Sequence, residues 1–284
     1  MSHRERLHLA KFRSAQKVAS VALAAFVFAA ACKSADRENV APSATARSSA
    51  DATPSASRSP RARELQRAGD LYYIELVTGG AAETAQLPLI IALHGLGDEP
   101  ASFGGLFSGF EFPARFALMR APDASGPGYS WFAFTGGDLE KPAAGIRKAA
   151  DQVAFAARQI AREHPTRGLP IVTGFSQGGA LSFAVAVLHP DEIGAAFPVG
   201  GWLPRELQPQ KGTRNAARGP KVVALHGEAD GRIPAQAARD AVSSLERAGY
   251  AVELITFAGV GHGMPSDVRM QLHALLADAL NAKR

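Results

Sequence analysis

Cysteine is nearly absent from the 284-residue chain, because Cys32 is the only one. A single cysteine excludes an intrachain disulfide and a metal site built from a cysteine cluster. Long hydrophobic runs are absent too, since the uncharged run over residues 18–31 is shorter than the roughly 20 residues that a membrane span needs. With 46% hydrophobic and 20% charged residues, the composition is globular. A wholly disordered chain, a collagen and a multi-span membrane protein are therefore excluded.

The excess of positive charge lies in the N-terminal part of the chain. The formal charge is +5, but residues 1–31 hold five basic and one acidic side chain, whereas residues 70–284 hold nineteen basic and twenty-one acidic ones. Because the excess of basic residues is confined to a terminal tail, the folded part has no excess of positive charge with which to bind nucleic acid. We therefore expect no nucleic-acid partner.

The N-terminal segment has the three parts of an export signal. Basic residues precede the uncharged run, and small residues end it, which is typical of a secretory signal peptide over residues 1–31. Ala29-Ala30-Ala31-Cys32 resembles a bacterial lipobox, in which the cysteine becomes lipidated, although Ala29 stands where leucine is usual. The resemblance implies a lipoprotein anchored through Cys32 to a membrane of the bacterial cell envelope. Ordinary cleavage near Ala31 is the alternative.

Residues 32–69 have the composition of a linker. Ala, Ser, Pro, Thr and Arg dominate, and Val40 and Leu65 are the only large aliphatic residues. No hydrophobic core forms from such a composition. We predict a flexible tether here, followed by a catalytic domain over residues 70–284.

From residue 70 onward, short apolar runs alternate with segments of helical periodicity. Residues 89–93 are apolar throughout, as in a strand buried on both faces, and residues 143–164 carry apolar residues at helical spacing. Further strands are predicted over 71–77, 116–120, 169–175, 193–199, 221–226 and 251–257, and helices over 177–188, 235–248 and 266–282. This alternation predicts an α/β fold, a mostly parallel central sheet with helices on both faces. Functional residues should follow the carboxyl ends of the strands.

A Gly-x-Ser-x-Gly motif lies between a predicted strand and a predicted helix. In Gly174-Phe175-Ser176-Gln177-Gly178-Gly179, side chains at positions 174 and 178 would collide with neighbouring backbone, and Gly179 permits close helix–sheet packing. This is the context of a nucleophile elbow, so Ser176 is the candidate nucleophile. The alternative is a tight turn with a solvated serine.

A serine nucleophile needs a base, which in this architecture follows it in the chain. Of the histidines at positions 189, 226, 262 and 273, only His262 lies in a glycine-rich loop directly after the last predicted strand. We interpret His262 as the base. For His226 and His94 we expect structural hydrogen bonds at strand ends.

The base needs an acceptor that fixes its tautomer. Between Ser176 and His262, only Glu228 and Asp230 lie in a loop that follows a predicted strand. Asp230 is preferred because the loop then turns into a helix, and Glu228 is the alternative.

An oxyanion hole needs two N–H donors. One is normally that of the residue after the nucleophile, here Gln177. The loop after residues 89–93 suits the second, because Gly95 and Gly97 allow the backbone to bend so that the Leu96 N–H faces the pocket.

Four segments together resemble the phospholipase/carboxylesterase family of α/β-hydrolases, which includes acyl-protein thioesterases and bacterial carboxylesterases. They are His94-Gly95-Leu96-Gly97-Asp98, Gly174-Phe175-Ser176-Gln177-Gly178-Gly179, Gly227-x-x-Asp230-x-x-Ile233-Pro234 and Gly261-His262. The resemblance implies the α/β-hydrolase fold and the roles of Ser176 as nucleophile, His262 as base, Asp230 as acid partner, and Leu96 and Gln177 as N–H donors.

The segment Ser130-Trp131-Phe132 resembles the family's Ser-Trp-Phe stretch near the binding site. Ala133 follows where the family commonly has aspartate, which argues against a thioesterase-like preference. Trp131 is either a pocket wall or a packed aromatic. Residues 121–142 hold several Gly and Pro and are expected to form a loop over the site.

These observations predict a serine hydrolase that cleaves carboxylic esters or thioesters of small or medium acyl chains through an acyl-enzyme. No metal and no organic cofactor is implied, and the expected partners are a small-molecule ester and, through the anchor, a membrane. A peptidase or a polyester- or feruloyl-type esterase would use the same residues. A non-catalytic, lipid-anchored binding protein is the third alternative.

Overall fold

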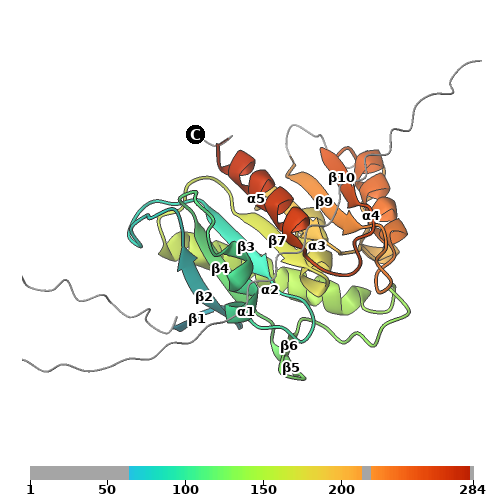
Figure 1. The fold of residues 1–284 in the computed structure, drawn as a ribbon, viewed down its shortest axis with the longest axis horizontal. Coiled ribbons are helices and arrows are strands. Elements are labelled where there is room, and N and C mark those ends of the chain that lie inside the picture. The colour runs from blue at the N-terminus through green and yellow to red at the C-terminus, as the bar shows by residue number, and fades with distance from the viewer. Residues whose placement is uncertain (1–63, 213–218, 282–284) are drawn as a thin grey trace, which may run out of the picture. The chain divides into compact units, whose positions relative to one another are not determined.

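The computed structural model describes residues 64–212 and 219–281, which form an α/β fold around an eight-stranded sheet (Figure 1). The strands of this sheet are β1 Leu65–Ala68, β2 Leu71–Val77, β3 Leu89–Leu93, β4 Arg115–Arg120, β7 Ile171–Phe175, β8 Ala195–Val199, β9 Lys221–Gly227 and β10 Val252–Phe257. Their order across the sheet is β1-β2-β4-β3-β7-β8-β9-β10. Within it β1–β2 and β2–β4 pair antiparallel and the other neighbours pair parallel, so the predicted fold class is confirmed.

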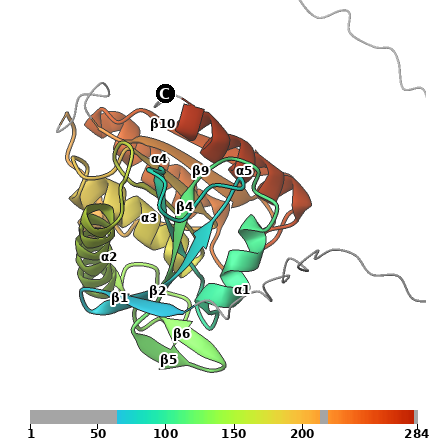
Figure 2. The same ribbon diagram turned by 90° about the vertical axis from the view of Figure 1, so that its left-hand side faces the viewer.

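Helices cover both faces of the sheet, as Figure 2 shows for α2 and α3 on one side and α1 and α5 on the other. The helices are α1 Pro100–Gly104, α2 Ala143–Glu163, α3 Gln177–Leu188, α4 Ala235–Ala248 and α5 Ser266–Asn281. Buried residues of α2, α3 and α4 join one core cluster, and those of α5 join the other. The helix predicted over 235–248 ends where predicted, and Gly249 terminates it with a left-handed φ of 93°.

The central strands alternate their side chains between the two core clusters. In β3, Leu89, Ile91 and Leu93 belong to the cluster under α2 and α3, whereas Ile90 and Ala92 belong to the cluster under α5. All five residues are completely buried. A strand covered on both faces must be apolar at every position, which is why its sequence is an unbroken apolar run.

The tether predicted over residues 32–69 extends too far, because its end contains β1. This strand pairs with β2 and buries Ala68, while Leu65 remains 40% exposed. An edge strand that includes Gln66 and Arg67 has no apolar run to reveal it. The signal peptide predicted for residues 1–31, Cys32 and the rest of the tether lie outside the described residues.

Residues 121–142, predicted as a loop, contain a short hairpin. Its strands are β5 Asp123–Ser125 and β6 Gly128–Ser130. The hairpin packs on the loop after β3, because Gly97 and Tyr129 are joined by a backbone hydrogen bond of 2.9 Å. This region is therefore tied to the carboxyl end of the sheet.

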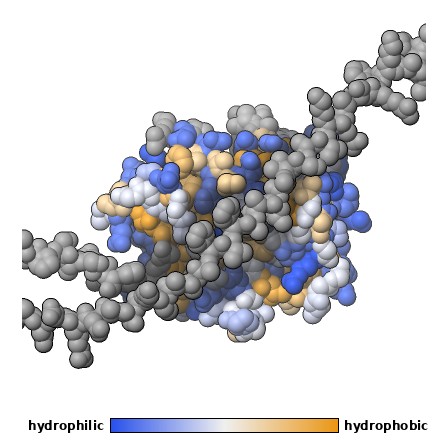
Figure 3. All heavy atoms as spheres, in the orientation of Figure 1, coloured by the Kyte–Doolittle hydropathy of each residue, from blue (hydrophilic) through white to orange (hydrophobic). Residues whose placement is uncertain are grey.

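Figure 3 shows hydrophilic and hydrophobic residues interspersed over the described part of the face in view. Among the described residues, no helix combines the length and the apolar character that crossing a membrane requires.

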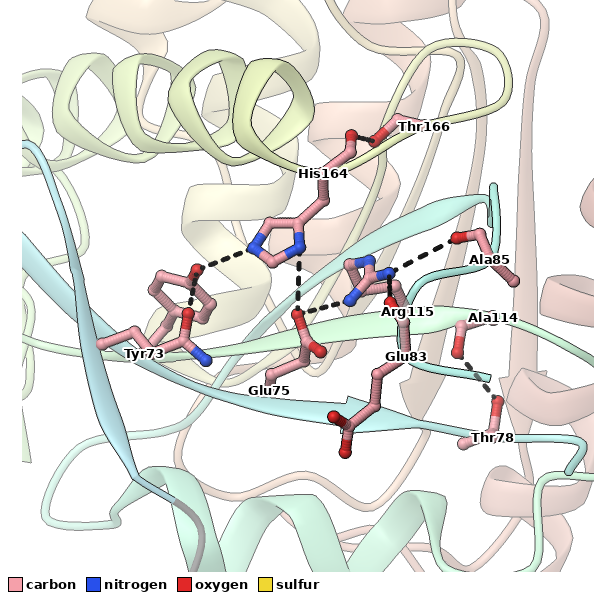
Figure 4. Close-up of polar contacts among 10 residues, drawn as sticks. Tyr73, Glu75, Thr78, Glu83, Ala85, Ala114, Arg115, His164 and Thr166 are labelled. Carbon is pink, nitrogen blue, oxygen red and sulfur yellow. Dashed lines mark hydrogen bonds and ion pairs between the residues drawn. The ribbon is translucent and has the colours of Figure 1, made fainter. Parts of the chain in front are cut away.

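A buried ionic cluster lies where β2, the start of β4 and the end of α2 meet (Figure 4). The Arg115 side chain is 1% exposed; its Nη1 lies 2.5 Å from Glu75 Oε2, and its Nη2 donates to the Glu83 carbonyl at 2.6 Å. His164 Nδ1 lies 3.6 Å from the same Glu75 oxygen. Burial, followed by the Glu75 carboxylate, raises the pKa of the Tyr73 hydroxyl to about 12. Because Arg115 begins β4, this cluster lies at the end of the parallel strands opposite to the predicted site.

Candidate active site

Ser176 lies on a strained turn between β7 and α3. Its φ of 57° and ψ of −113° make it the one non-glycine residue with a positive φ in the described part of the chain. Such a backbone costs on the order of 1–3 kcal/mol and persists only where the surrounding structure holds it. The turn presents Ser176 at the carboxyl end of β7 and at the N-terminus of α3, which is the geometry of a nucleophile elbow.

Glycines allow this turn because the backbones around it approach very closely. A Cβ atom at position 178 would lie 2.0 Å from the Leu93 carbonyl oxygen, and one at position 174 would lie 2.5 Å from the backbone of Gly178. A Cβ atom at Gly179 would lie 2.5 Å from the Val199 carbonyl oxygen. The predicted collisions at 174 and 178 and the close helix–sheet packing at Gly179 are thus confirmed.

The structure brings Ser176, His262 and Asp230 together from three separate loops. His262 Nε2 lies 2.9 Å from Ser176 Oγ, and His262 Nδ1 lies 2.7 Å from Asp230 Oδ2. Because the carboxylate accepts, the hydrogen belongs on Nδ1, which leaves Nε2 free to accept the serine proton. Asp230 Oδ1 accepts from the backbone N–H groups of Arg232 and Ile233, both at 2.9 Å. The loop therefore fixes its own carboxylate.

The environment of Asp230 favours the ionised form. Burial opposes ionisation, but the hydrogen bond from His262 and those from the Ile233 and Arg232 N–H groups outweigh it and lower the pKa of the Asp230 carboxyl. The Asp230 side chain is 1% exposed and that of His262 10% exposed. A buried carboxylate in this position stabilises an imidazolium if His262 takes a proton.

Two further histidines lie at strand ends, where they make structural hydrogen bonds as predicted. His94 Nδ1 donates to the Gly95 carbonyl at 2.7 Å, and His94 Nε2 accepts from the Ala121 N–H at 3.2 Å. His226 Nε2 donates to the Ile233 carbonyl at 2.9 Å. Burial lowers the pKa of both side chains and thereby favours their neutral forms.

The other candidates for base and acid face elsewhere. His189 Nε2 lies 2.8 Å from Asp151 Oδ1, and His273 Nε2 donates to the Leu106 carbonyl at 2.9 Å. The Glu228 side chain is 44% exposed and accepts from the Thr256 hydroxyl. None of the three is positioned as His262 and Asp230 are.

The two residues predicted to supply N–H donors flank Ser176. Gln177 is the first residue of α3, so no carbonyl of the helix lies four residues before it. Leu96 precedes Gly97, whose φ of 77° bends the loop after β3. Within the described residues, neither the Leu96 nor the Gln177 N–H has a hydrogen-bond partner. Both donors are therefore available to a bound oxyanion.

The side chain of Gln177 fixes the segment after β6, a role that the sequence did not reveal. Gln177 Oε1 accepts from the Trp131 N–H at 3.0 Å, and Gln177 Nε2 donates to the Phe132 carbonyl at 2.9 Å. The Trp131 indole N–H donates to the His94 carbonyl at 2.9 Å. Trp131 is 3% exposed and packs in the core, so it is the packed aromatic of the two alternatives and no pocket wall.

A cavity of about 160 Å³ opens beside Ser176 and His262. Its two other ionisable side chains are Asp98 and Arg232. The rest of its wall is formed by backbone and apolar side chains of Gly95, Leu96, Phe134, Phe175 and Ile233. Phe134 and Arg232 were not predicted, because no local pattern shows which loop residues turn towards a cavity. Over residues 64–212 and 219–281, no cluster of His, Cys, Asp or Glu is arranged to hold a metal ion.

Comparison with known families decides the assignment. The model of the phospholipase/carboxylesterase family matches residues 77–278, most of the described chain. The chain belongs to this family. A probable carboxylesterase of Oryza sativa subsp. japonica is 28% identical over 220 residues, 72% of this chain and 82% of that one. A probable inactive carboxylesterase of the same plant is 28% identical over 193 residues, 62% of this chain and 78% of that one.

Solved structures show the same fold. The crystal structure of esterase PE8 matches with a TM-score of 0.63 and 23% identity over 74% of this chain and 99% of that one. Zea mays acyl-protein thioesterase 2 matches with a TM-score of 0.58 and 20% identity over 72% of this chain and 98% of that one. The phospholipase/carboxylesterase-family member described here is thus a hydrolase with the α/β-hydrolase fold.

Proposed function

We propose that this hydrolase cleaves carboxylic esters, or thioesters, of small or medium acyl chains through an acyl-enzyme on Ser176. The observation that carries the proposal is the chain of hydrogen bonds from Ser176 Oγ through His262 to Asp230, at 2.9 and 2.7 Å. The cavity beside Ser176, about 160 Å³, supports a small acyl group, because pockets for drug-sized ligands measure roughly 300–1,000 Å³.

In the first half-reaction, Ser176 Oγ attacks the ester carbonyl while His262 Nε2 takes the serine proton. The oxyanion of the tetrahedral intermediate accepts from the N–H groups of Leu96 and Gln177. When the intermediate collapses, His262 gives its proton to the departing alcohol or thiol, and the acyl group stays on Ser176. Water then attacks the acyl-enzyme, losing a proton to His262, and the acid leaves as Ser176 recovers its proton.

Hydrolysis of p-nitrophenyl esters from acetate to palmitate tests the reaction. Activity should peak at a short or medium chain, and Ser176→Ala should lower kcat at least about 10³-fold with an unchanged fold. Ser102→Ala, at an exposed position of α1, is the matched control and should keep wild-type rates. Near-normal turnover by Ser176→Ala would overturn the proposal.

A fluorophosphonate probe gives an independent readout, because it reacts only with an activated serine. We expect labelling of the wild-type chain and none of Ser176→Ala. An unlabelled wild-type chain would favour a non-catalytic binding protein, a real alternative in a family with a probable inactive relative. Labelling with turnover of peptides and no preference for esters would favour a peptidase.

We also propose that the chain is exported and lipidated at Cys32, which places the hydrolase at a membrane of a bacterial cell envelope. The basic N-terminal region, the short apolar run and the Ala29-Ala30-Ala31-Cys32 sequence support this. Labelled palmitate should be incorporated by the wild-type chain and not by Cys32→Ala. Incorporation that persists in Cys32→Ala contradicts the anchor.

A further inference from the structure

Arg232 lies on the wall of the cavity beside Ser176 and has no ion-pair partner in the part of the chain that the structure describes. It lies two residues after Asp230, and its backbone N–H is bonded to the Asp230 carboxylate at 2.9 Å. The position of its backbone is therefore fixed by the same carboxylate that orients His262. Its side chain is exposed and, among the described residues, forms no ion pair.

The other basic residue of this region is paired. Arg239, on α4, lies 3.7 Å from Glu228 and takes no part in the cavity wall. Arginine presents up to five N–H donors in a planar fork that matches a carboxylate or a phosphate. With no ion-pair partner among residues 64–212 and 219–281, Arg232 can offer this fork to an anion beside the candidate nucleophile.

The two charged residues of the cavity follow strands that lie on opposite sides of the strand carrying Ser176. Asp98 follows β3 and Arg232 follows β9, and the strand that carries Ser176, β7, lies between these two in the sheet. Within the described residues Asp98 and Arg232 form no ion pair with each other, and Asp98 Oδ1 accepts from the Glu99 N–H at 2.8 Å. A substrate that bridges the cavity meets a negative side at β3 and a positive side at β9.

We propose that Arg232 selects esters that carry an anionic group a few atoms away from the scissile bond. The inference rests on the proposed function, because it concerns the substrate of the same serine. The anion lies towards the β9 side, where it accepts charge-assisted hydrogen bonds from the guanidinium. An anionic group on the acyl part and one on the alcohol part offer the same chemistry, and two substrate pairs separate them.

The first pair is mono-4-nitrophenyl glutarate and 4-nitrophenyl pentanoate, which differ by a carboxylate in place of a methyl group. The second is 4-carboxyphenyl butyrate and its methyl ester, with the charge on the leaving group. For at least one pair, the ratio of kcat/KM for the charged over the neutral ester should fall about five- to thirtyfold in Arg232→Gln. Arg232→Lys should recover much of the ratio.

Two further variants sharpen the test. Asp98→Asn should raise the same ratio, because it removes the opposing charge. Arg239→Gln changes the net charge by the same amount outside the cavity and should leave the ratio unchanged. The wild-type ratio should also fall as NaCl is raised from about 0.05 to 0.5 M, since added salt screens partly exposed charges.

These experiments distinguish failure of the Arg232 proposal from failure of the proposed serine-hydrolase function. If the neutral esters are cleaved and Ser176→Ala abolishes this, but Arg232→Gln leaves both ratios at the wild-type value, Arg232 does not select anions and the serine-hydrolase proposal survives. If no ester is cleaved and the fluorophosphonate probe does not react, the proposed function itself fails.

Discussion

The side chain of Gln177 is bonded to the backbone N–H of Trp131 at 3.0 Å, so the residue after the candidate nucleophile also anchors the segment behind the cavity. Gln177 is 1% exposed, and its amide also reaches the Phe132 carbonyl. The side chain of Gln177 therefore fixes the segment that leads to Phe134 on the cavity wall, while its backbone N–H is the predicted oxyanion donor.

Gln177→Met should lower the stability of the protein. It should leave the candidate oxyanion donor in place, because that donor is the backbone N–H. The substitution leaves the buried Trp131 N–H without its acceptor and removes one of the two donors to the Phe132 carbonyl, the other being the Ser130 hydroxyl at 2.8 Å. The free energy of unfolding should therefore fall by about 1–3 kcal/mol. Urea denaturation measures this. Gln236→Met, on the exposed face of α4, is the control and should change stability by less than about 0.5 kcal/mol. Equal effects of the two substitutions would contradict the anchoring role.

Asp230→Asn should lower kcat for ester hydrolysis by up to about 10⁴-fold, because the amide favours the wrong tautomer of His262. The neighbouring Glu228→Gln is the matched control. Its carboxylate interacts with Thr256 and Arg239, so its removal should leave kcat within about twofold. A larger loss in Glu228→Gln than in Asp230→Asn would reverse the assignment of the acid.

Glu75→Gln should be strongly destabilising, because it leaves the buried Arg115 guanidinium without a counter-charge (Figure 4). Breaking one side of such a pair costs about 3–5 kcal/mol. Urea unfolding measures the loss. The double substitution Glu75→Leu with Arg115→Met removes both charges and should recover most of the stability. A single substitution with wild-type stability would show that the pair contributes nothing.

Stability should fall as the pH drops below about 6.5. His94 and His226 have pKa values lowered by burial, so the unfolded chain binds more protons than the folded one in this range. The free energy of unfolding then decreases with decreasing pH, by up to about 1.4 kcal/mol per pH unit for each histidine. The lowered pKa of Asp230 adds a loss at still lower pH, as that carboxylate becomes protonated.

Urea denaturation at pH 5, 6 and 7 measures this slope. His94→Gln and His226→Gln should each flatten it. Gln236→Met, which removes no titratable group, is the control and should leave the slope unchanged. An unchanged slope in both buried-histidine variants would contradict the account.

The sequence predicts the buried half of this fold well and its periphery poorly. The bounds of β3, α3 and α4 are those predicted, because strands and helices buried by neighbours carry dense apolar patterns. The edge strand β1 and the hairpin of β5 and β6 are short and partly polar, so their stability comes from pairing partners that the local sequence does not specify.

The same distinction holds at the candidate site. Ser176, Asp230 and His262 follow strands and are flanked by glycines, so local patterns identify them. Phe134, Arg232 and the side-chain contacts of Gln177 depend on how distant loops converge after folding. Convergence of this kind is a tertiary property, and no spacing rule along the chain encodes it.

Because Ser176 has a positive φ, selection for heat resistance and selection for activity favour different residues at this position. Glycine adopts this backbone without strain, so Ser176→Gly should relieve about 1–3 kcal/mol and lose only about 0.5–1 kcal/mol through added freedom of the unfolded chain. A variant library screened for melting temperature alone would therefore enrich variants with glycine at position 176, which lack the Ser176 hydroxyl. Directed evolution of a more heat-resistant form needs activity in every round of screening.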